Sequence, residues 1–185
     1  LFFEDKVQVC DNISPYLIAG PNVYCTPVDT PISELPQMKM GSNAVDGKRL
    51  ILERAEVEQI VAKTPEARRY IRPYGGTKEM LSGVHRWCVW IEESDVHDAL
   101  ALEPLNEIVE SCRLYREGAG RDAKKAARRP YAFCYSTFEN RDFIHIGNTI
   151  GNALPLVPAD LRAAGYVSNH NAFTIYGARL HVFAI

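Results

Sequence analysis

The stretch YIRPYGGTKEMLSGVHRWCVWI, residues 70–91, decides the fold, because it contains a proline- and glycine-rich segment that ends a helix, followed by a clear strand pattern. Its last six residues, RWCVWI (86–91), are β-branched, aromatic or otherwise apolar on both faces of an extended chain. That pattern is typical of a strand inside a sheet, where both faces are covered. Pro73 lacks a backbone donor, and two glycines follow it, so residues 72–76 should end the helix before them. The stretch therefore predicts a central strand at 86–91.

Helical patterns occur before this stretch. Val57, Ile60 and Val61 recur at helical spacing and predict a helix over residues 54–63. The Thr-Pro pair that follows is typical of a helix start, with threonine as the N-cap and proline at the first helical position. It predicts a second short helix at 65–71.

Two further helices are expected after the central strand. Residues 104–116 carry apolar side chains on one face, which is typical of an amphipathic helix. Residues 121–129 would form another helix, with alanines on one face and basic residues on the opposite face, ended by Pro130. The segment 113–129 holds seven basic and two acidic residues, a local charge of +5 in a chain whose net charge is −2.

Short strands joined by turns should make up the rest of the chain. Prolines and glycines are frequent in residues 1–48, and the C-terminal third alternates apolar runs with turn residues. The predicted class is α+β, with strand-rich N- and C-terminal parts around a mixed or antiparallel sheet and helices inserted in the middle. Strands are expected at 16–18, 23–25, 50–52, 131–135, 142–146, 173–176 and 180–183.

Length and composition are those of an ordinary globular protein. The 185 residues suit one large domain or two small subdomains, and 46% are hydrophobic and 24% charged. The chain has no apolar run of about 20 residues, the length of a membrane span. The first residue is not methionine and the last residues are apolar. We therefore expect a fragment of a longer protein, with a truncated C-terminal end.

Catalytic motifs are missing from the sequence. A DNA methyltransferase needs a glycine-rich cofactor loop and, for amino-group methylation, an Asn/Asp-Pro-Pro-aromatic motif, and neither occurs. The histidines do not have metal-ligand spacing. The five cysteines are expected to be small buried thiols in a reducing cytoplasm: Cys10, Cys25, Cys88, Cys112 and Cys134. A cysteine–histidine nucleophile stays open, since such partners meet only in space.

Four stretches, in this order, resemble the target-recognition region of the MmeI-like type IIG/IIL restriction-modification DNA methyltransferases. They are ISPYLIAGPNVY (13–24), MGSNAVDGKRLIL (40–52), the opening stretch 70–91, and STFENRDFIHIG (136–147). The third stretch is the most specific, because it combines a Tyr-Ile-Arg-Pro-aromatic start, a Gly-x-x-Glu loop and an Arg-aromatic-Cys strand. The resemblance covers nearly the whole chain.

The resemblance implies a DNA target-recognition domain over residues 1–185, with residues 1–20 as the linker from a methyltransferase core. Such a domain recognises double-stranded DNA and is non-catalytic by itself. S-adenosylmethionine would bind to the methyltransferase domain of the same parent chain, which would be adenine-specific, with or without a fused endonuclease. The fragment itself would bind no cofactor. A prokaryotic, cytoplasmic protein without a membrane partner is expected.

Two groups of residues are candidates for DNA contact. Phosphate contacts supply affinity, and forked polar side chains supply base recognition. The base-contact candidates are Ser136, Thr137, Glu139, Asn140, Arg141 and Asp142. The phosphate-contact candidates are Lys78, Arg86, Arg121, Lys124, Lys125, Arg128 and Arg129.

Other interpretations stay open at this point. The basic helix face could be merely solvated, Arg86 could pair with Glu79, and residues 136–142 could be a polar hairpin turn. The chain could instead be a protein–protein interaction module, or a small hydrolase that uses Cys134 or Cys88 with a histidine.

Overall fold

The computed structural model describes residues 2–3, 6–7, 9–28, 35–149 and 156–178. The chain forms two compact units, Leu1–Glu34 and Leu35–Ile185. The expected boundary at residue 20 stays a prediction. The strand expected at 180–183 lies outside the described residues.

The first unit contains little regular structure. Strands β1 (Phe2–Phe3) and β2 (Lys6–Val7) pair antiparallel. The strands predicted at 16–18 and 23–25 are wrong. Pro15 lies in a turn in which Leu17 N–H donates to the Ser14 carbonyl (2.9 Å), and Leu17 has a positive φ of 59°. That backbone conformation is incompatible with an extended strand.

The second unit contains two four-stranded sheets, which confirms the α+β class. The first has the order β4–β6–β5–β9, with β4 Ile51–Leu52, β6 Arg86–Val89, β5 Ile71–Gly75 and β9 Val167–Ser168. Its pairs are antiparallel except β5 with β9, so it is mixed. The second has the order β3–β10–β7–β8 and is antiparallel, with β3 Met38–Met40, β10 Ala172–Tyr176, β7 Phe143–Gly147 and β8 Ala159–Arg162.

The predicted central strand is confirmed. Strand β6 pairs with β4 on one side and β5 on the other. Cys88 and Val89 are fully buried, and consecutive strand residues point to opposite faces, so both faces are covered here. The turn after β5 needs glycine, because a Cβ on Gly76 would collide with the side chain of Asn169.

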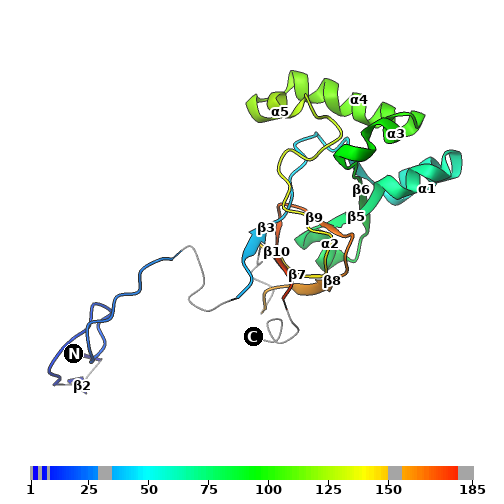
Figure 1. Ribbon diagram of the computed structural model, residues 1–185. Helices are drawn as coiled ribbons and strands as arrows, with labels where there is room; N and C mark the ends of the chain where they lie inside the picture. The colour runs from blue at the N-terminus through cyan, green and yellow to red at the C-terminus, as the bar shows by residue number, and fades with distance from the viewer. Residues whose placement is uncertain (1, 4–5, 8, 29–34, 150–155, 179–185) are drawn as a thin grey trace. The chain divides into compact units, whose positions relative to one another are not determined.

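Helices lie between and around the strands; those at 54–63, 103–118 and 121–126 were predicted, whereas the short helices at 77–82 and 96–100 were not. The helices are α1 Arg54–Lys63, α2 Thr77–Ser82, α3 Val96–Leu100, α4 Glu103–Gly118 and α5 Arg121–Ala126, with 3-10 turns η1 Pro65–Tyr70 and η2 Glu93–Asp95. The helix predicted at 65–71 is thus a 3-10 helix. Figure 1 shows α3, α4 and α5 grouped at one end of this unit and β7, β8 and β10 at the other.

The core of this unit lies where β5 and β6 meet α4. Leu50, Leu105 and Cys112 are among its fully buried side chains. The strand predicted at 131–135 is wrong. Phe133 packs into this core beside Trp90, with ring centroids 5.2 Å apart, and only Tyr135 forms an isolated bridge, to Asn43. Packing of single side chains, rather than strand pairing, explains the apolar residues there.

Candidate nucleic-acid interface

Helix α5 presents a basic surface, as the alanine spacing predicted. Ala123 is buried, whereas Arg121, Lys124, Lys125 and Arg128 are exposed. The helix ends at Ala126 instead of residue 129, and the chain continues as a turn in which Arg129 N–H donates to the Ala126 carbonyl (3.0 Å). Among the described residues, none of these four cations forms an ion pair.

Arg129 differs from its neighbours. Its guanidinium pairs with the Glu93 carboxylate at 2.5 Å, and the Tyr131 hydroxyl donates to the same carboxylate at 2.8 Å. Hydrogen bonds from Tyr131 and Arg129 lower the pKa of Glu93. Arg129 is exposed but already holds η2 against the chain that follows α5, so a phosphate would compete with Glu93 for it.

Two arginines of α4 do not belong to this basic surface, although they contribute to the local charge of +5. Arg113 pairs with Glu110 (2.9 Å) and Glu117 (2.6 Å). Arg116 is completely buried. Helical spacing places Arg116 on the buried face of α4 with Leu105 and Cys112, but the sequence gave no sign of its partners, which are backbone carbonyls of other segments.

A short segment links α5 to the polar loop at 136–142. Residues 132–135 and α5 line a hollow that includes Lys125 and Arg128. At its end, Tyr135 and Asn43 exchange two backbone hydrogen bonds of 2.8 and 3.0 Å. The basic surface and the polar loop are therefore consecutive parts of one anchored segment.

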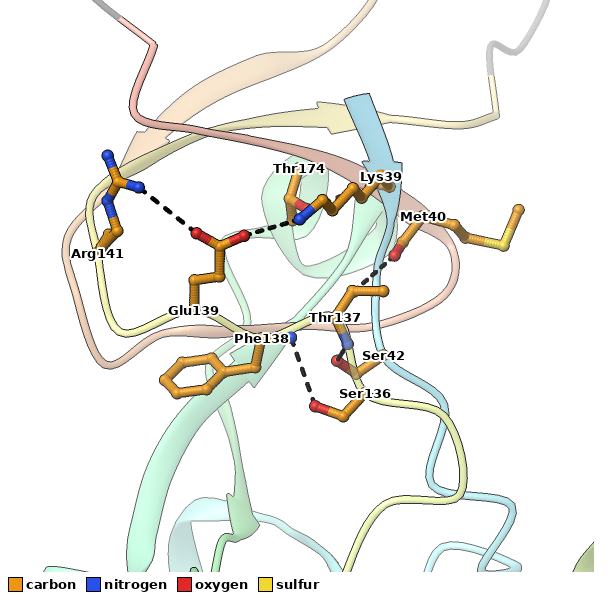
Figure 2. Close-up of polar contacts among 9 residues, drawn as sticks. All are labelled: Lys39, Met40, Ser42, Ser136, Thr137, Phe138, Glu139, Arg141 and Thr174. Atoms are coloured by element: carbon orange, nitrogen blue, oxygen red, sulfur yellow. Dashed lines mark hydrogen bonds and ion pairs between the residues drawn. The ribbon is translucent and has the colours of Figure 1, made fainter. Parts of the chain in front are cut away.

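The first half of the polar loop is tied to strand β3 (Figure 2). The Thr137 hydroxyl donates to the Met40 carbonyl at 2.7 Å, and the Thr137 N–H donates to the Ser42 hydroxyl at 3.1 Å. The Ser136 hydroxyl accepts from the Phe138 N–H at 3.4 Å. Phe138 packs against Trp90, with centroids 4.8 Å apart. The backbone of the loop is thus fixed before any ligand arrives.

Glu139 lies between two cations (Figure 2). One carboxylate oxygen accepts from Lys39 Nζ at 2.8 Å, and the other is 3.6 Å from an Arg141 guanidinium nitrogen. Arg141 is 62% exposed, and Asn140 beside it is exposed too. Sequence reasoning missed Lys39, which is 100 residues away from Glu139. The alternation Met-Lys-Met at 38–40 was its only signal.

Asp142 and the candidates at 78 and 86 have other surroundings. Asp142 accepts from the Ala164 N–H at 2.8 Å, which joins the start of β7 to the turn after β8. Arg86 pairs with the buried Glu79 at 2.7 Å, which is the ion pair that the sequence analysis left open as an alternative to a phosphate contact. Lys78 is exposed on α2, which Figure 1 shows near β7 and β8 rather than beside α5. The structure does not bring these two basic residues together with the α5 surface.

The cysteines differ from the predicted set of buried thiols. Cys88 and Cys112 are buried, Cys10 and Cys134 are half-buried, and Cys25 is exposed, so the prediction is wrong for Cys25. Burial raises the pKa of the Cys88 thiol, the opposite of what a nucleophile needs. Within the described ranges, no cluster of metal-ligating side chains is present, and no helix is long and apolar enough to cross a membrane.

Comparisons with known proteins agree with these features. A family model described as "MmeI, target recognition domain" matches residues 19–185. DNA methyltransferase A of Bacillus subtilis (strain 168) is 25% identical over 187 residues, which is 100% of this chain and 21% of that protein. The structure of the type IIL restriction-modification enzyme MmeI in complex with DNA matches with a TM-score of 0.80 and 23% identity, over 94% of this chain and 23% of that one.

The shared fold and the family match define a target recognition domain. The chain belongs to the family of MmeI target recognition domains. It spans only about a fifth of the length of the relatives that it matches.

Proposed function

We propose that this chain recognises a specific sequence in double-stranded DNA and is not catalytic by itself. Its family membership supports this proposal, as does the likeness of its fold to an enzyme solved with DNA. The chain would guide a methyltransferase domain of the same parent protein. That domain, and not these residues, would bind S-adenosylmethionine and methylate adenine, with or without a fused endonuclease. The parent would act in the cytoplasm of a prokaryote.

The observation that carries the proposal is the layout of residues 121–142. An exposed basic helix, whose cations have no carboxylate partner among the described residues, leads through residues 127–135 to a polar loop whose backbone is anchored to β3. Cations on a flexible stem suit phosphate contacts, which supply affinity without base specificity. Forked side chains on a fixed backbone suit base edges, which need defined geometry.

Within this layout, each group of candidates has its part. Lys124, Lys125 and Arg128, together with Arg121, would contact phosphates. Asn140 and Arg141 are exposed forked side chains of the loop and would contact bases, an adenine edge and a guanine edge respectively. Ser136, Thr137 and Asp142 have internal hydrogen bonds and would mainly hold the loop.

Duplex binding as a function of salt tests the phosphate half of the proposal. The double variant Lys125→Glu/Arg128→Glu should weaken binding to a fluorescein-labelled random-sequence duplex at least tenfold. It should also reduce the slope of log K against log salt by about 2, since two phosphate contacts are lost. Fluorescence anisotropy between low and moderate ionic strength measures both quantities.

Lys63→Gln is the control, because Lys63 ends α1, which Figure 1 shows on the opposite side of the group of helices from α5. Glutamine removes the charge without placing a second carboxylate beside Glu103, the partner of Lys63 at 2.8 Å. This variant should leave the slope unchanged. Undetectable binding by the unmodified chain, or binding without any salt slope, would contradict the proposal. An unchanged slope in the double variant would favour a protein interaction module.

Mapping of methylated adenines in the source genome tests the sequence-specific half. We expect a recurrent motif that disappears when the gene is deleted, and that changes when Asn140 or Arg141 is replaced in the intact parent. A genome without such a motif, or a motif insensitive to both residues, would show that the loop does not read bases.

A further inference from the structure

We propose that Arg116 is a positioning residue for DNA binding, which sets the pose of helix α5 without touching DNA itself. The inference rests on the proposed function, because it assigns how the basic surface of that function is held in place. Its basis is the unusual environment of the Arg116 side chain.

Arg116 uses every donor of its guanidinium inside the protein. Its Nε donates to the Val45 carbonyl (3.2 Å), and its two terminal nitrogens each donate to two further carbonyls. These four are Ala126 (3.0 Å), Arg129 (2.9 Å), Ala44 (2.6 Å) and Ala132 (2.8 Å). A guanidinium has five N–H donors, so this set of five carbonyls saturates it.

The five carbonyls come from three places that the sequence keeps apart. Residues 44–45 precede β4 at the edge of the core, whereas Ala126 and Arg129 end α5 and the turn after it. Ala132 begins the segment that leads to the polar loop. One buried side chain on α4 therefore ties the end of the basic helix and the start of the loop segment to the body of the fold.

Helix α5 depends on such ties more than a longer helix would. It has six residues and buries one side chain, Ala123. A helix of this length is not stable by itself in water, so tertiary contacts must define its position. The carbonyl at Ala126 lies at its C-terminal end, where a nearby cation is favourable.

The hydrogen bonds of Arg116 also fix part of the wall of the hollow beside α5. Ala126, Arg129 and Ala132, whose carbonyls bind Arg116, line the same hollow as Lys125 and Arg128. The buried guanidinium thus lies beneath this hollow and fixes its walls. Five carbonyl dipoles, and no carboxylate among the described residues, meet the charge of Arg116.

The test compares three variants of the whole 185-residue chain. Arg116→Met removes all five donors at similar length, Arg116→Lys keeps the charge but only three donors, and Leu105→Ala opens a cavity elsewhere on α4. Each is assayed well below its own melting temperature with the fluorescein-labelled random duplex.

Arg116→Met should bind about tenfold more weakly, with the salt slope reduced by about 2, since Lys125 and Arg128 no longer meet phosphates together. Leu105→Ala should keep the wild-type slope despite its lower melting temperature.

A double-mutant cycle separates positioning from general damage. In a background in which Arg121, Lys124, Lys125 and Arg128 are all replaced by alanine, Arg116→Met should have almost no further effect on the affinity, because it acts through those four cations. An unchanged slope in Arg116→Met, or a full additional loss in the four-alanine background, would overturn the inference. Where Arg116→Met does not fold, Arg116→Lys decides by the same two readouts. Absence of binding by the unmodified chain would refute the proposed function instead.

Discussion

At the scale of single residues, His145 gives the chain a defined acid sensitivity. The imidazole is buried in β7, with Nε2 2.9 Å from the Ser168 hydroxyl. Burial, reinforced by Arg162 and opposed by Asp160, lowers the pKa of His145 to about 4. Because histidine in the unfolded chain has a pKa of about 6.5, the unfolded chain takes up the proton before the folded chain as pH falls. The stability is therefore intact above about pH 6.5 and declines toward pH 4, by about 3 kcal/mol at most.

Replacement of His145 should remove most of this decline. Thermal melts of His145→Gln and of the unmodified chain between pH 7 and pH 4.5 should converge at the acid end, since glutamine does not titrate. His170→Gln is the control, because His170 is exposed. Parallel pH profiles for His145→Gln and the unmodified chain would show that another group causes the acid loss.

The sequence predicted which side chains are exposed to solvent better than it predicted their hydrogen-bond and ion-pair partners. The alanine spacing of α5 placed its lysines and arginines outside, because helical periodicity is a local property. Arg116 lies on the apolar face of α4, four residues after Cys112, but the five carbonyls that allow its charge to be buried lie between 10 and 72 residues away. Lys39 went unnoticed for the same reason. Long-range contacts decide such cases, and no window of sequence contains them.

At the scale of elements, the anchoring of the polar loop on β3 should govern its rigidity. Thr137→Val removes the hydroxyl bond to the Met40 carbonyl but keeps the shape of the side chain. A bond of this kind contributes about 1 kcal/mol, so amide exchange in residues 137–141 should become about fivefold faster. Hydrogen exchange with mass spectrometry measures this change.

Thr149→Val is the matched control, since Thr149 is exposed and its hydroxyl donates to the neighbouring Asn148 side chain. Equal exchange in both variants would mean that Phe138 packing, rather than the Thr137 bond, holds the loop.

Elements with several side chains on a buried face were predicted well, and apolar runs without such a face were not. Helices α1 and α4 and strands β6, β7 and β10 lie within one or two residues of their expected bounds, because each has several side chains on a buried face. Residues 131–135 have similar apolar content, but Phe133 and Tyr131 are used singly for packing. A run of five residues does not distinguish these two uses.

At the scale of the whole molecule, every candidate DNA-contact residue lies in the second unit, Leu35–Ile185. The two sheets, the core and the anchors of the polar loop belong to that unit as well. Deletion of residues 1–34 should therefore leave a folded protein, with a melting temperature within a few degrees of the whole chain and the same salt slope on random duplex. Differential scanning fluorimetry and the anisotropy titration measure the two properties.

Deletion through residue 43 is the informative comparison, because it removes β3 with Lys39, the Ser42 hydroxyl and the Tyr135 bridge. That longer deletion should free residues 135–142 and destabilise the second sheet, because β10 would lose one of its two partner strands and become an edge strand. If the shorter deletion also abolished cooperative unfolding or the salt slope, the first unit would have to be part of the recognition machinery.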